Sequence, residues 1–384
     1  MNSNNSIFEE RKKTRDDLVS LKKPKRVPVF SIFTLEAACG LAEVSVMEAH
    51  YDLSVAEKAY DRICETFYSD SLPVLNLRYP PVYDALGSRN WVLGSNGSMQ
   101  HSEVELMHTD EYDEFIAGPM KMIMEVFLPR ACSELDKDSA RAGIALAKAF
   151  AEYKSQVRNH AEIYGRLAEK HSYADGIITG PLTVAPFDFI ADQLRGIKGI
   201  MGDIYRAPEK LLEAVNAVTP HMLKLAVPRG VAERIQCFIP LHLAPLINPA
   251  QFDRLYWPSL KRLVESADAL GVGSTIFLEQ DCTRYIESFD SLPDSMIAWI
   301  DDGDRESFAA GLGRNHVFGG FFDPTITLAR SKEECIDEAK RLLDTCMDSG
   351  HFFFSFNRNV MDIKSIDIAK LAAVLEWVRN NAYY

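Results

Sequence analysis

Three side chains able to bind a metal or transfer a proton lie together in STIFLEQDCT, residues 274–283. Glu279, Asp281 and Cys282 follow directly on a run of β-forming residues. Because Glu279 and Asp281 are two positions apart, an extended segment would point both to one face and Cys282 away from it. Two such carboxylates either repel, which raises one pKa, or share a cation. The alternative is that Asp281 belongs to the cap of a helix starting near Thr283.

The elements that must position this stretch follow from the hydrophobic pattern. Apolar, β-rich runs alternate with longer stretches of helical periodicity, and we identify eight such runs at residues 27–33, 72–77, 176–179, 234–243, 274–278, 296–300, 316–321 and 351–356. This alternation predicts an α/β protein with a parallel sheet, and eight strands are the number that closes a (β/α)₈ TIM barrel. An open doubly wound sheet is the alternative, but no GxGxxG turn follows the first run.

One segment does not fit this alternation. Residues 78–110 match no crossover helix well, and their Gly, Asn, Ser and Pro content predicts a long loop or hairpin inserted after strand two. We expect residues 1–20 to form a flexible N-terminal segment or helix, and residues 21–384 to form a single barrel domain.

In such barrels the active site lies at the carboxyl ends of the strands. That rule selects His242, after the fourth run, as a further candidate for proton transfer, although a lone histidine in apolar surroundings is often a core residue. It also selects residues that would bind a substrate. These are the amides Asn76 and Asn357, together with aromatic side chains near the rim that would wall an aromatic ring, namely Phe33, Tyr79, Trp91, Phe322 and Phe354.

Composition limits the class of protein. The net charge of −13 provides no basic footprint for nucleic acid. No apolar run approaches the roughly 18–20 residues that span a bilayer, and the polar N-terminus has no apolar signal-peptide core. The seven cysteines form no CxxC pair, which indicates reduced thiols and a cytoplasmic location.

Six stretches carry a resemblance to a known family: residues 10–30, GIITGPLTVA (176–185), 206–219, 247–271, VFGGFFDP (317–324) and SGHFFFSF (349–356). Together they resemble the uroporphyrinogen decarboxylase superfamily over nearly the whole chain. The resemblance implies a (β/α)₈ barrel and one of two activities. One is decarboxylation of the acetate arms of uroporphyrinogen, and the other is methyl transfer involving corrinoid proteins.

Departures from the family pattern favour methyl transfer. Decarboxylases carry an N-terminal segment like RQAGRY, which residues 27–50 do not match, and their late Gly-His motif falls near Asn357. We also expect few cationic side chains at the rim for an octacarboxylate. In the thiol-methylating branch, zinc is held by His-x-Cys and a final Cys. Glu279 and Asp281 stand at that pair, and these harder ligands suit a thiol acceptor poorly.

The resemblance therefore implies a methyltransferase of an O-demethylase system. It would take a methyl group from a small donor, with a methoxylated aromatic expected, and pass it to the cobalt of a separate corrinoid protein. Glu279, Asp281 and His242 would act as general acid or through a divalent metal such as zinc, with Glu279, Asp281 and Cys282 as candidate ligands. The alternatives are a uroporphyrinogen decarboxylase-type enzyme and a non-catalytic barrel that binds a tetrapyrrole or a partner. A homodimer is compatible with the family.

Overall fold

The computed structural model describes residues 3–76, 78–102, 105–230 and 234–384. Residue 77 of the predicted run 72–77, residues 103–104 of the predicted insertion and residues 1–2 of the N-terminal segment lie outside the described residues. Among the described residues, no helix combines the length and apolar character needed to cross a membrane.

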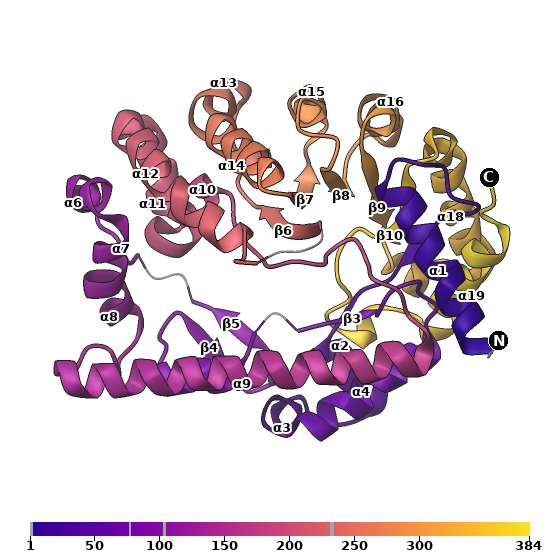
Figure 1. Cartoon of the computed structure of the whole chain (residues 1–384), viewed down its shortest axis with the longest axis horizontal. Coiled ribbons are helices and arrows are strands. Elements are labelled where there is room, and N and C mark those ends of the chain that lie inside the picture. Colours follow the sequence, from indigo (N-terminus) through magenta and orange to yellow (C-terminus); the bar gives the residue numbers. More distant parts are fainter. Residues whose placement is uncertain (1–2, 77, 103–104, 231–233) are drawn as a thin grey trace.

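Six parallel strands form one continuous sheet in the order β1-β10-β9-β8-β7-β6. The strands are β1 (Val29–Phe30), β6 (Ile235–Leu241), β7 (Val272–Asp281), β8 (Ile297–Asp302), β9 (Val317–Phe322) and β10 (Phe352–Phe356). Their cover of helices lies on the outside of the curved sheet (Figure 1). It consists of α12 (Pro208–Ala226), α14 (Trp257–Ala269), α15 (Ile286–Asp290), α16 (Arg305–Gly311), α18 (Lys332–Cys346) and α19 (Ile368–Asn381).

The remaining part of the ring is built from shorter pairings. The first run continues past β1 into β2 (Phe33–Thr34), which pairs in parallel with β3 (Val74–Leu75). Residues 174–183 then bridge β3 and β6 through the isolated parallel pairs Ser71–Ala174 and Leu182–Phe238. The eight predicted positions therefore follow one another around the ring, and the chain has the predicted α/β barrel architecture.

The third predicted run, 176–179, is the one that forms no regular strand. Gly180 and Thr179 both donate their backbone N–H to the carbonyl of Gln236, so the ladder slips there. Pro181, which follows, has no N–H to donate. The segment keeps its place in the ring but not the hydrogen-bond pattern of a strand.

The predicted insertion after strand two is confirmed as a hairpin. Strand β4 (Trp91–Leu93) pairs antiparallel with β5 (Met99–His101). A short helix that the sequence pattern did not indicate, α5 (Pro80–Leu86), precedes it, with prolines in its first turn where a missing N–H costs nothing. The long helix α9 (Ser139–His171) then returns alongside this region over roughly 50 Å (Figure 1).

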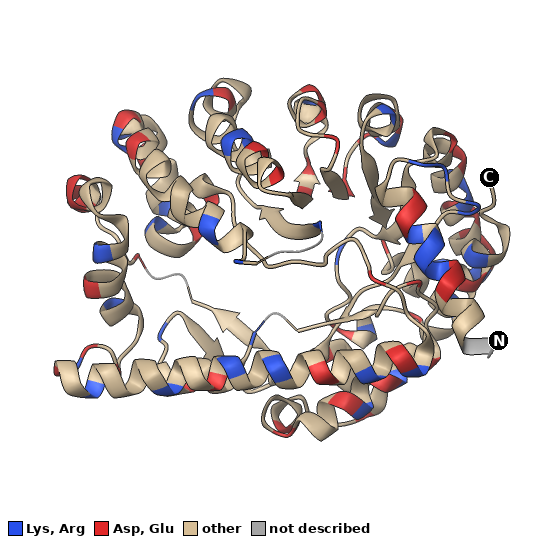
Figure 2. Cartoon of the chain, viewed as in Figure 1, with Lys and Arg blue, Asp and Glu red and all other residues tan. Residues whose placement is uncertain are grey.

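The other helices are short or cover the N-terminal half. They are α1 (Ser3–Val19), α2 (Leu35–Ala42), α3 (Val46–Tyr51), α4 (Leu53–Thr66), α6 (Tyr112–Ala117), α7 (Pro119–Met122), α8 (Leu128–Ala131), α10 (Pro186–Asp188), α11 (Gly196–Arg206), α13 (Pro249–Gln251) and α17 (Ile326–Ala329). Charged residues are spread over the helices, and acidic residues lie at the tip of β7 (Figure 2).

The strands bury both of their faces. In β8, Ile297 and Trp299 belong to the cluster inside the ring, whereas Ala298 and Ile300 pack with the outer layer of helices. The inner cluster also contains Phe277, whose ring centroid lies 4.5 Å from that of Trp299. Because side chains fill the interior, a functional site has to lie at the ends of the strands.

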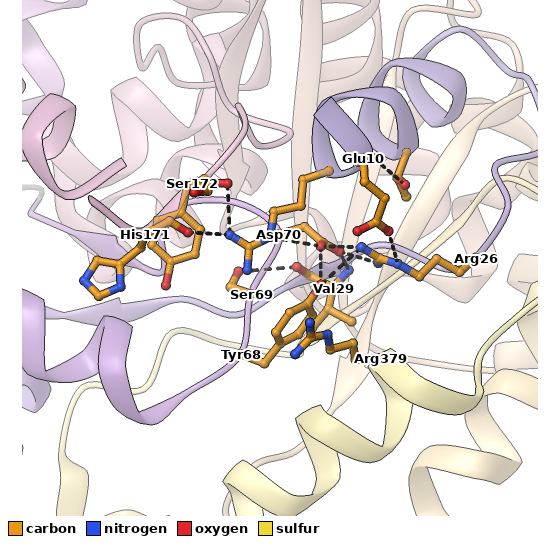
Figure 3. A network of polar contacts seen from close by, with 12 residues as sticks. Glu10, Arg26, Val29, Tyr68, Ser69, Asp70, His171, Ser172 and Arg379 are labelled. Atoms are coloured by element: carbon orange, nitrogen blue, oxygen red, sulfur yellow. Dashed lines mark hydrogen bonds and ion pairs between the residues drawn. The ribbon is translucent and has the colours of Figure 1, made fainter. Parts of the chain in front are cut away.

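The amino ends of β1 and β3 are joined by buried charges (Figure 3). Arg26, just before β1, donates from Nη1 and Nη2 to the two oxygens of Asp70, both at 2.7 Å. Arg11 of α1 donates to the carbonyls of His171 and Ser172 at 2.7 and 3.0 Å. This network ties α1 to the barrel. The division into residues 1–20 and a domain over 21–384 stays a prediction.

Candidate active site

The polar group at the mouth of the barrel centres on His242, which directly follows β6. Its Nδ1 donates to Asp192 Oδ2 at 2.5 Å, and its Nε2 lies 3.5 Å from Glu279 Oε1. Asp192 comes from the π-helical segment Phe189–Arg195 that follows α10. The imidazole is 37% exposed, so it faces the solvent-accessible mouth. Two elements far apart in sequence thus hold one histidine between two carboxylates.

These carboxylates control the charge of His242. Burial of the ring opposes the charged form, but the hydrogen bond and negative charge of Asp192, followed by the charge of Glu279, raise the pKa of His242 to about 9. The imidazole is therefore positively charged at neutral pH. Since Nδ1 is engaged by Asp192, the proton on Nε2 is the one available to a substrate.

A second carboxylate fixes the backbone beneath His242. Asp188 is fully buried and accepts the backbone N–H of His242 at 2.9 Å and that of Leu243 at 3.2 Å. Tyr256 donates its hydroxyl to the same carboxylate at 2.7 Å. Burial, followed by the charge of Asp192, raises the pKa of Asp188 to about 7. Asp188 positions the histidine without reaching the mouth.

Glu279 and Asp281 separate at the end of β7. Gln280 has a φ of 55°, in the left-handed region, and the pairing register with β8 shifts between Leu278 and Asp281. Asp281 therefore turns away and accepts the backbone N–H of Thr283 at 2.8 Å. The shared face expected for an extended segment is not formed. Asp281 instead belongs to the turn that begins the 3₁₀ helix Thr283–Tyr285, as in the alternative, although the N-cap residue itself is Cys282.

Glu279 remains at the mouth with His242. Burial raises the pKa of the Glu279 carboxyl, while the charge of His242 opposes that rise. The end of β8 also contacts this segment, because Asp301 accepts the backbone N–H of Gln280, the residue after Glu279, at 2.9 Å. Glu279 is thus a half-buried carboxylate facing a cationic imidazole.

The three candidate metal ligands do not converge. Cys282 is fully buried, its Sγ donates to the carbonyl of Glu279 at 3.7 Å, and burial raises the pKa of its thiol to about 12. Asp281 turns towards Thr283 and Cys282 is buried, so neither side chain lies beside Glu279 as a second ligand. Within the described ranges, no group of three or more His, Cys, Asp or Glu side chains is arranged to hold a metal. The donor set does not fit a bound divalent ion, so we derive no step through one.

Arginines lie at the rim, contrary to the expectation of few cations there. Three of them line a cavity of about 400 Å³ beyond the ends of β8, β9 and β10, together with Asn357: they are Arg305, Arg330 and Arg358. Each is engaged by a carboxylate. Arg358 donates from Nε to Asp301 at 2.9 Å, and Arg305 lies 2.8 Å from Glu338, which Arg330 approaches to 3.5 Å.

Three of the expected aromatic wall residues, Phe33, Phe322 and Phe354, are core residues instead. Phe33 is fully buried, stacks on Phe67 with centroids 4.5 Å apart and meets Phe356 edge-on at 5.6 Å. Phe322 is fully buried against Phe354 at 5.2 Å. The pleat sends these side chains into the packed layer rather than into the mouth, because alternate residues of a strand point to opposite faces.

The other expected substrate-binding residues lie near the mouth. Asn76 donates to Nε2 of His160 at 3.1 Å. The ring of Tyr79 lies 5.1 Å from that of His160, centroid to centroid. Trp91 of β4 stacks on His101, with ring centroids 4.3 Å apart, and the guanidinium of Arg78 lies 4.2 Å from the ring centroid of Trp91. Asn357 lies apart from these, in the cavity near β8 to β10.

Sequence reasoning missed Asp188 and Asp192. Their signal was a pair of carboxylates four residues apart, in the segment that starts nine residues after the third predicted run. Such a pair at a strand end of a barrel meets the same positional rule that selected His242.

A barrel of parallel strands with its polar groups at the strand ends is typical of α/β-barrel enzymes. The profile of the family described as Uroporphyrinogen decarboxylase (URO-D) matches residues 143–380, more than half of the chain. The chain therefore belongs to the uroporphyrinogen decarboxylase family, which confirms the resemblance predicted from its sequence.

Among solved structures, a methyltransferase from Methanosarcina mazei has a similar fold, with a TM-score of 0.62 and 14% sequence identity. The similarity covers 96% of this chain and 98% of that chain. At this identity the likeness concerns the fold. No curated protein matches the chain.

Proposed function

We propose that the chain is a methyltransferase that takes a methyl group from a small methoxylated aromatic and passes it to the cobalt of a corrinoid protein. The observation that carries the proposal is the charged imidazole of His242, held at the mouth of the barrel between Asp192 and Glu279. A likeness in fold to a methyltransferase supports the same reaction class.

An aryl methyl ether is unreactive because phenolate is a poor leaving group, so its oxygen needs a proton as the carbon–oxygen bond breaks. A Co(I) corrinoid, as the methyl acceptor, supplies the electron pair for the new bond to the methyl carbon. The electron pair of the broken bond goes to the ether oxygen, and His242 donates its Nε2 proton to that oxygen. The products are a phenol and the methylated acceptor.

The neighbouring residues keep His242 ready for this step. Asp192 holds Nδ1, which leaves Nε2 as the donor, and its negative charge keeps the ring protonated at neutral pH. Asp188 fixes the backbone of residue 242. Glu279, 3.5 Å from Nε2, adds a second negative charge beside the same ring.

The charge balance at the mouth supports methyl transfer over decarboxylation of uroporphyrinogen. An octacarboxylate needs arginines that are available to its acid groups. Arg305, Arg330 and Arg358 already engage Glu338 and Asp301.

We further propose a cytoplasmic location, since a Co(I) acceptor requires reducing conditions. The seven cysteines, all free and buried, are compatible with that setting.

The test mixes the purified protein with cob(I)alamin and a panel of methoxylated aromatics, and follows methylcobalamin formation by its visible spectrum. We expect His242→Gln to lower the rate by about 10²–10⁴-fold, the usual contribution of a general acid. Asp281→Asn, which removes a carboxylate that only caps a turn, is the matched control and should keep the rate. Transfer that survives His242→Gln would contradict the assigned role. Absence of transfer from every donor would favour a barrel that only binds.

A further inference from the structure

A second cavity, of about 170 Å³, lies at the mouth of the barrel beside the inserted hairpin. It is framed by the carboxyl ends of β2 and β3, by α3, by both strands of the hairpin and by the loop after β10. Its polar lining residues are Thr34, Glu36, His50, Asn76 and Arg78, and its apolar ones are Leu75, Trp91, Met99 and Met361. Neither the proposed proton donor nor its carboxylate partners belong to this lining.

One side of the cavity holds a buried ring nitrogen without a partner. His50 is 3% exposed, and its Nε2 lies 2.8 Å from the carbonyl of Gly97. A carbonyl only accepts, so Nε2 carries the hydrogen and, in the neutral ring, Nδ1 is an acceptor. No polar atom of the described residues satisfies Nδ1.

The hydroxyl of Thr34, like Nδ1 of His50, is a buried polar group without a hydrogen-bond partner among the described residues. Thr34 precedes α2 as its N-cap residue, but its side chain makes no capping bond. Its Oγ1 is buried and has no hydrogen-bond partner in the described part of the chain. Because buried polar atoms are nearly always paired, two unpaired ones on the lining of one cavity indicate a ligand or water that supplies the partners.

The hairpin that closes the cavity is held in place before any ligand arrives. Gly97, at the hairpin turn, has a φ of 83°, and an added Cβ would lie 2.8 Å from Cβ of Val46 in α3. Glycine permits both the left-handed backbone and this close approach. With the bond from His50 to Gly97, the turn is fixed on α3, so the cavity is a preformed site.

The oppositely charged Glu36 and Arg78 and the amide of Asn76 also line the cavity, and the remaining lining is apolar. Trp91 presents an indole that stacks on His101, and Leu75, Met99 and Met361 supply adaptable apolar surface. The volume of about 170 Å³ is close to that of an engineered protein cavity of roughly 150 Å³ that takes up benzene. A single aromatic ring fits that size, and a hydroxyl on it can donate to His50 Nδ1 or accept from Thr34.

We propose that this cavity is a binding site for a small neutral phenol-type ring, which neither the family match nor the fold assigns. The inference deepens the proposed function and rests on it for one point, the identification of the ring with the methyl donor or its phenol product. The loop after β10 connects the two regions, since Arg358 bonds Asp301 near Glu279 whereas Met361 lines this cavity.

The test measures binding of three probes by titration calorimetry: phenol, 2-methoxyphenol and methoxybenzene. The last has the ring and the ether without a hydroxyl. We expect Thr34→Val to weaken binding of both phenols about tenfold, the effect of one lost hydrogen bond, and to leave methoxybenzene unchanged. Thr345→Val, at a half-buried position on α18 far from this lining, is the matched control and should bind all three like the wild type.

A folding check accompanies the binding data. Because the Thr34 hydroxyl has no partner, Thr34→Val should melt at the same temperature as the wild type or higher. Equal affinity of wild type and Thr34→Val for phenol would overturn the proposal. Absence of heat with all three probes would also overturn it and leave a cavity for water only.

The same variants separate this inference from the proposed function. His242→Gln should bind 2-methoxyphenol like the wild type while losing methyl transfer. Binding that depends on Thr34, without transfer by the wild type, would leave the cavity assigned and remove the proposed reaction. Transfer by the wild type, with phenol binding indifferent to Thr34→Val, would keep the reaction and overturn the cavity assignment.

Discussion

Replacing Asp192 by asparagine tests whether its charge keeps His242 protonated. The pKa of His242 is about 9 with Asp192 in place. Without that charge, burial lowers the pKa of His242 while the charges of Glu279 and Asp188 still raise it, and we expect a pKa close to the ordinary value of 6.5. At pH 7.5 the protonated fraction would then fall from about 0.97 to about 0.09. If His242 donates the proton, the transfer rate at pH 7.5 should fall about tenfold.

The assay follows methylcobalamin formation between pH 5.5 and pH 9.5. The wild-type rate should decline only as the pH rises through about 9. The Asp192→Asn rate should decline near pH 6.5 and approach the wild-type rate below that pH. NMR titration of the His242 ring reports the same shift independently of turnover. An unchanged titration of His242 in Asp192→Asn would refute the electrostatic reasoning, and a shifted titration with an unchanged rate profile would refute the general-acid role.

The same interaction makes stability depend on pH. A histidine whose folded-state pKa lies above its unfolded value stabilises the fold fully below the unfolded pKa, and that contribution fades as the pH rises through the folded pKa. For His242 the window runs from about 6.5 to about 9. Asp192→Asn should therefore lower the melting temperature more at pH 6 than at pH 9.5. The ring is 37% exposed, so solvent screens part of the effect.

Three further substitutions probe the parts around the mouth and the opposite end of the barrel. Asp70→Ala removes the buried carboxylate partner of Arg26, leaves it only the exposed Glu10 as an ion-pair partner and should cost up to about 3–5 kcal/mol in urea unfolding; a loss below 1 kcal/mol would contradict the buried pairing. Tyr256→Phe removes one donor to Asp188 and should cost about 1–2 kcal/mol, with no cost expected if the contact is not formed. Cys282→Ala should keep the transfer rate, because the thiol is buried away from the mouth; loss of transfer with an intact fold would return Cys282 to the reaction.

The barrel was predictable because its strands are covered on both faces and read as continuous apolar runs. The hairpin was predictable for a different reason, since Gly97 and the polar residues around it interrupt every helical period. The third strand was over-predicted, because the apolar run GIIT is followed at once by Gly180 and Pro181, which break the ladder. Apolar content marks where a segment lies in the ring, whereas its hydrogen bonds depend on backbone geometry that composition does not specify.

The site was predicted where the strand rule sufficed and missed where the backbone departs from it. His242 and Glu279 were selected because they end strands. The pairing of Glu279 with Asp281 failed at one residue, Gln280, whose φ of 55° reverses the alternation. Glutamine has no particular preference for that conformation, so no local sequence signal indicates it.

Those departures themselves mark the site. The π-helical segment Phe189–Arg195 supplies Asp192, and the segment Phe252–Tyr256, also π-helical, ends at the tyrosine that donates to Asp188. Such segments insert extra residues into a helix and occur often at functional sites. Two helices and one strand thus leave their regular geometry around the same histidine. Regular packing alone gives no reason for these irregularities to meet there, and their meeting supports the proposed role of His242.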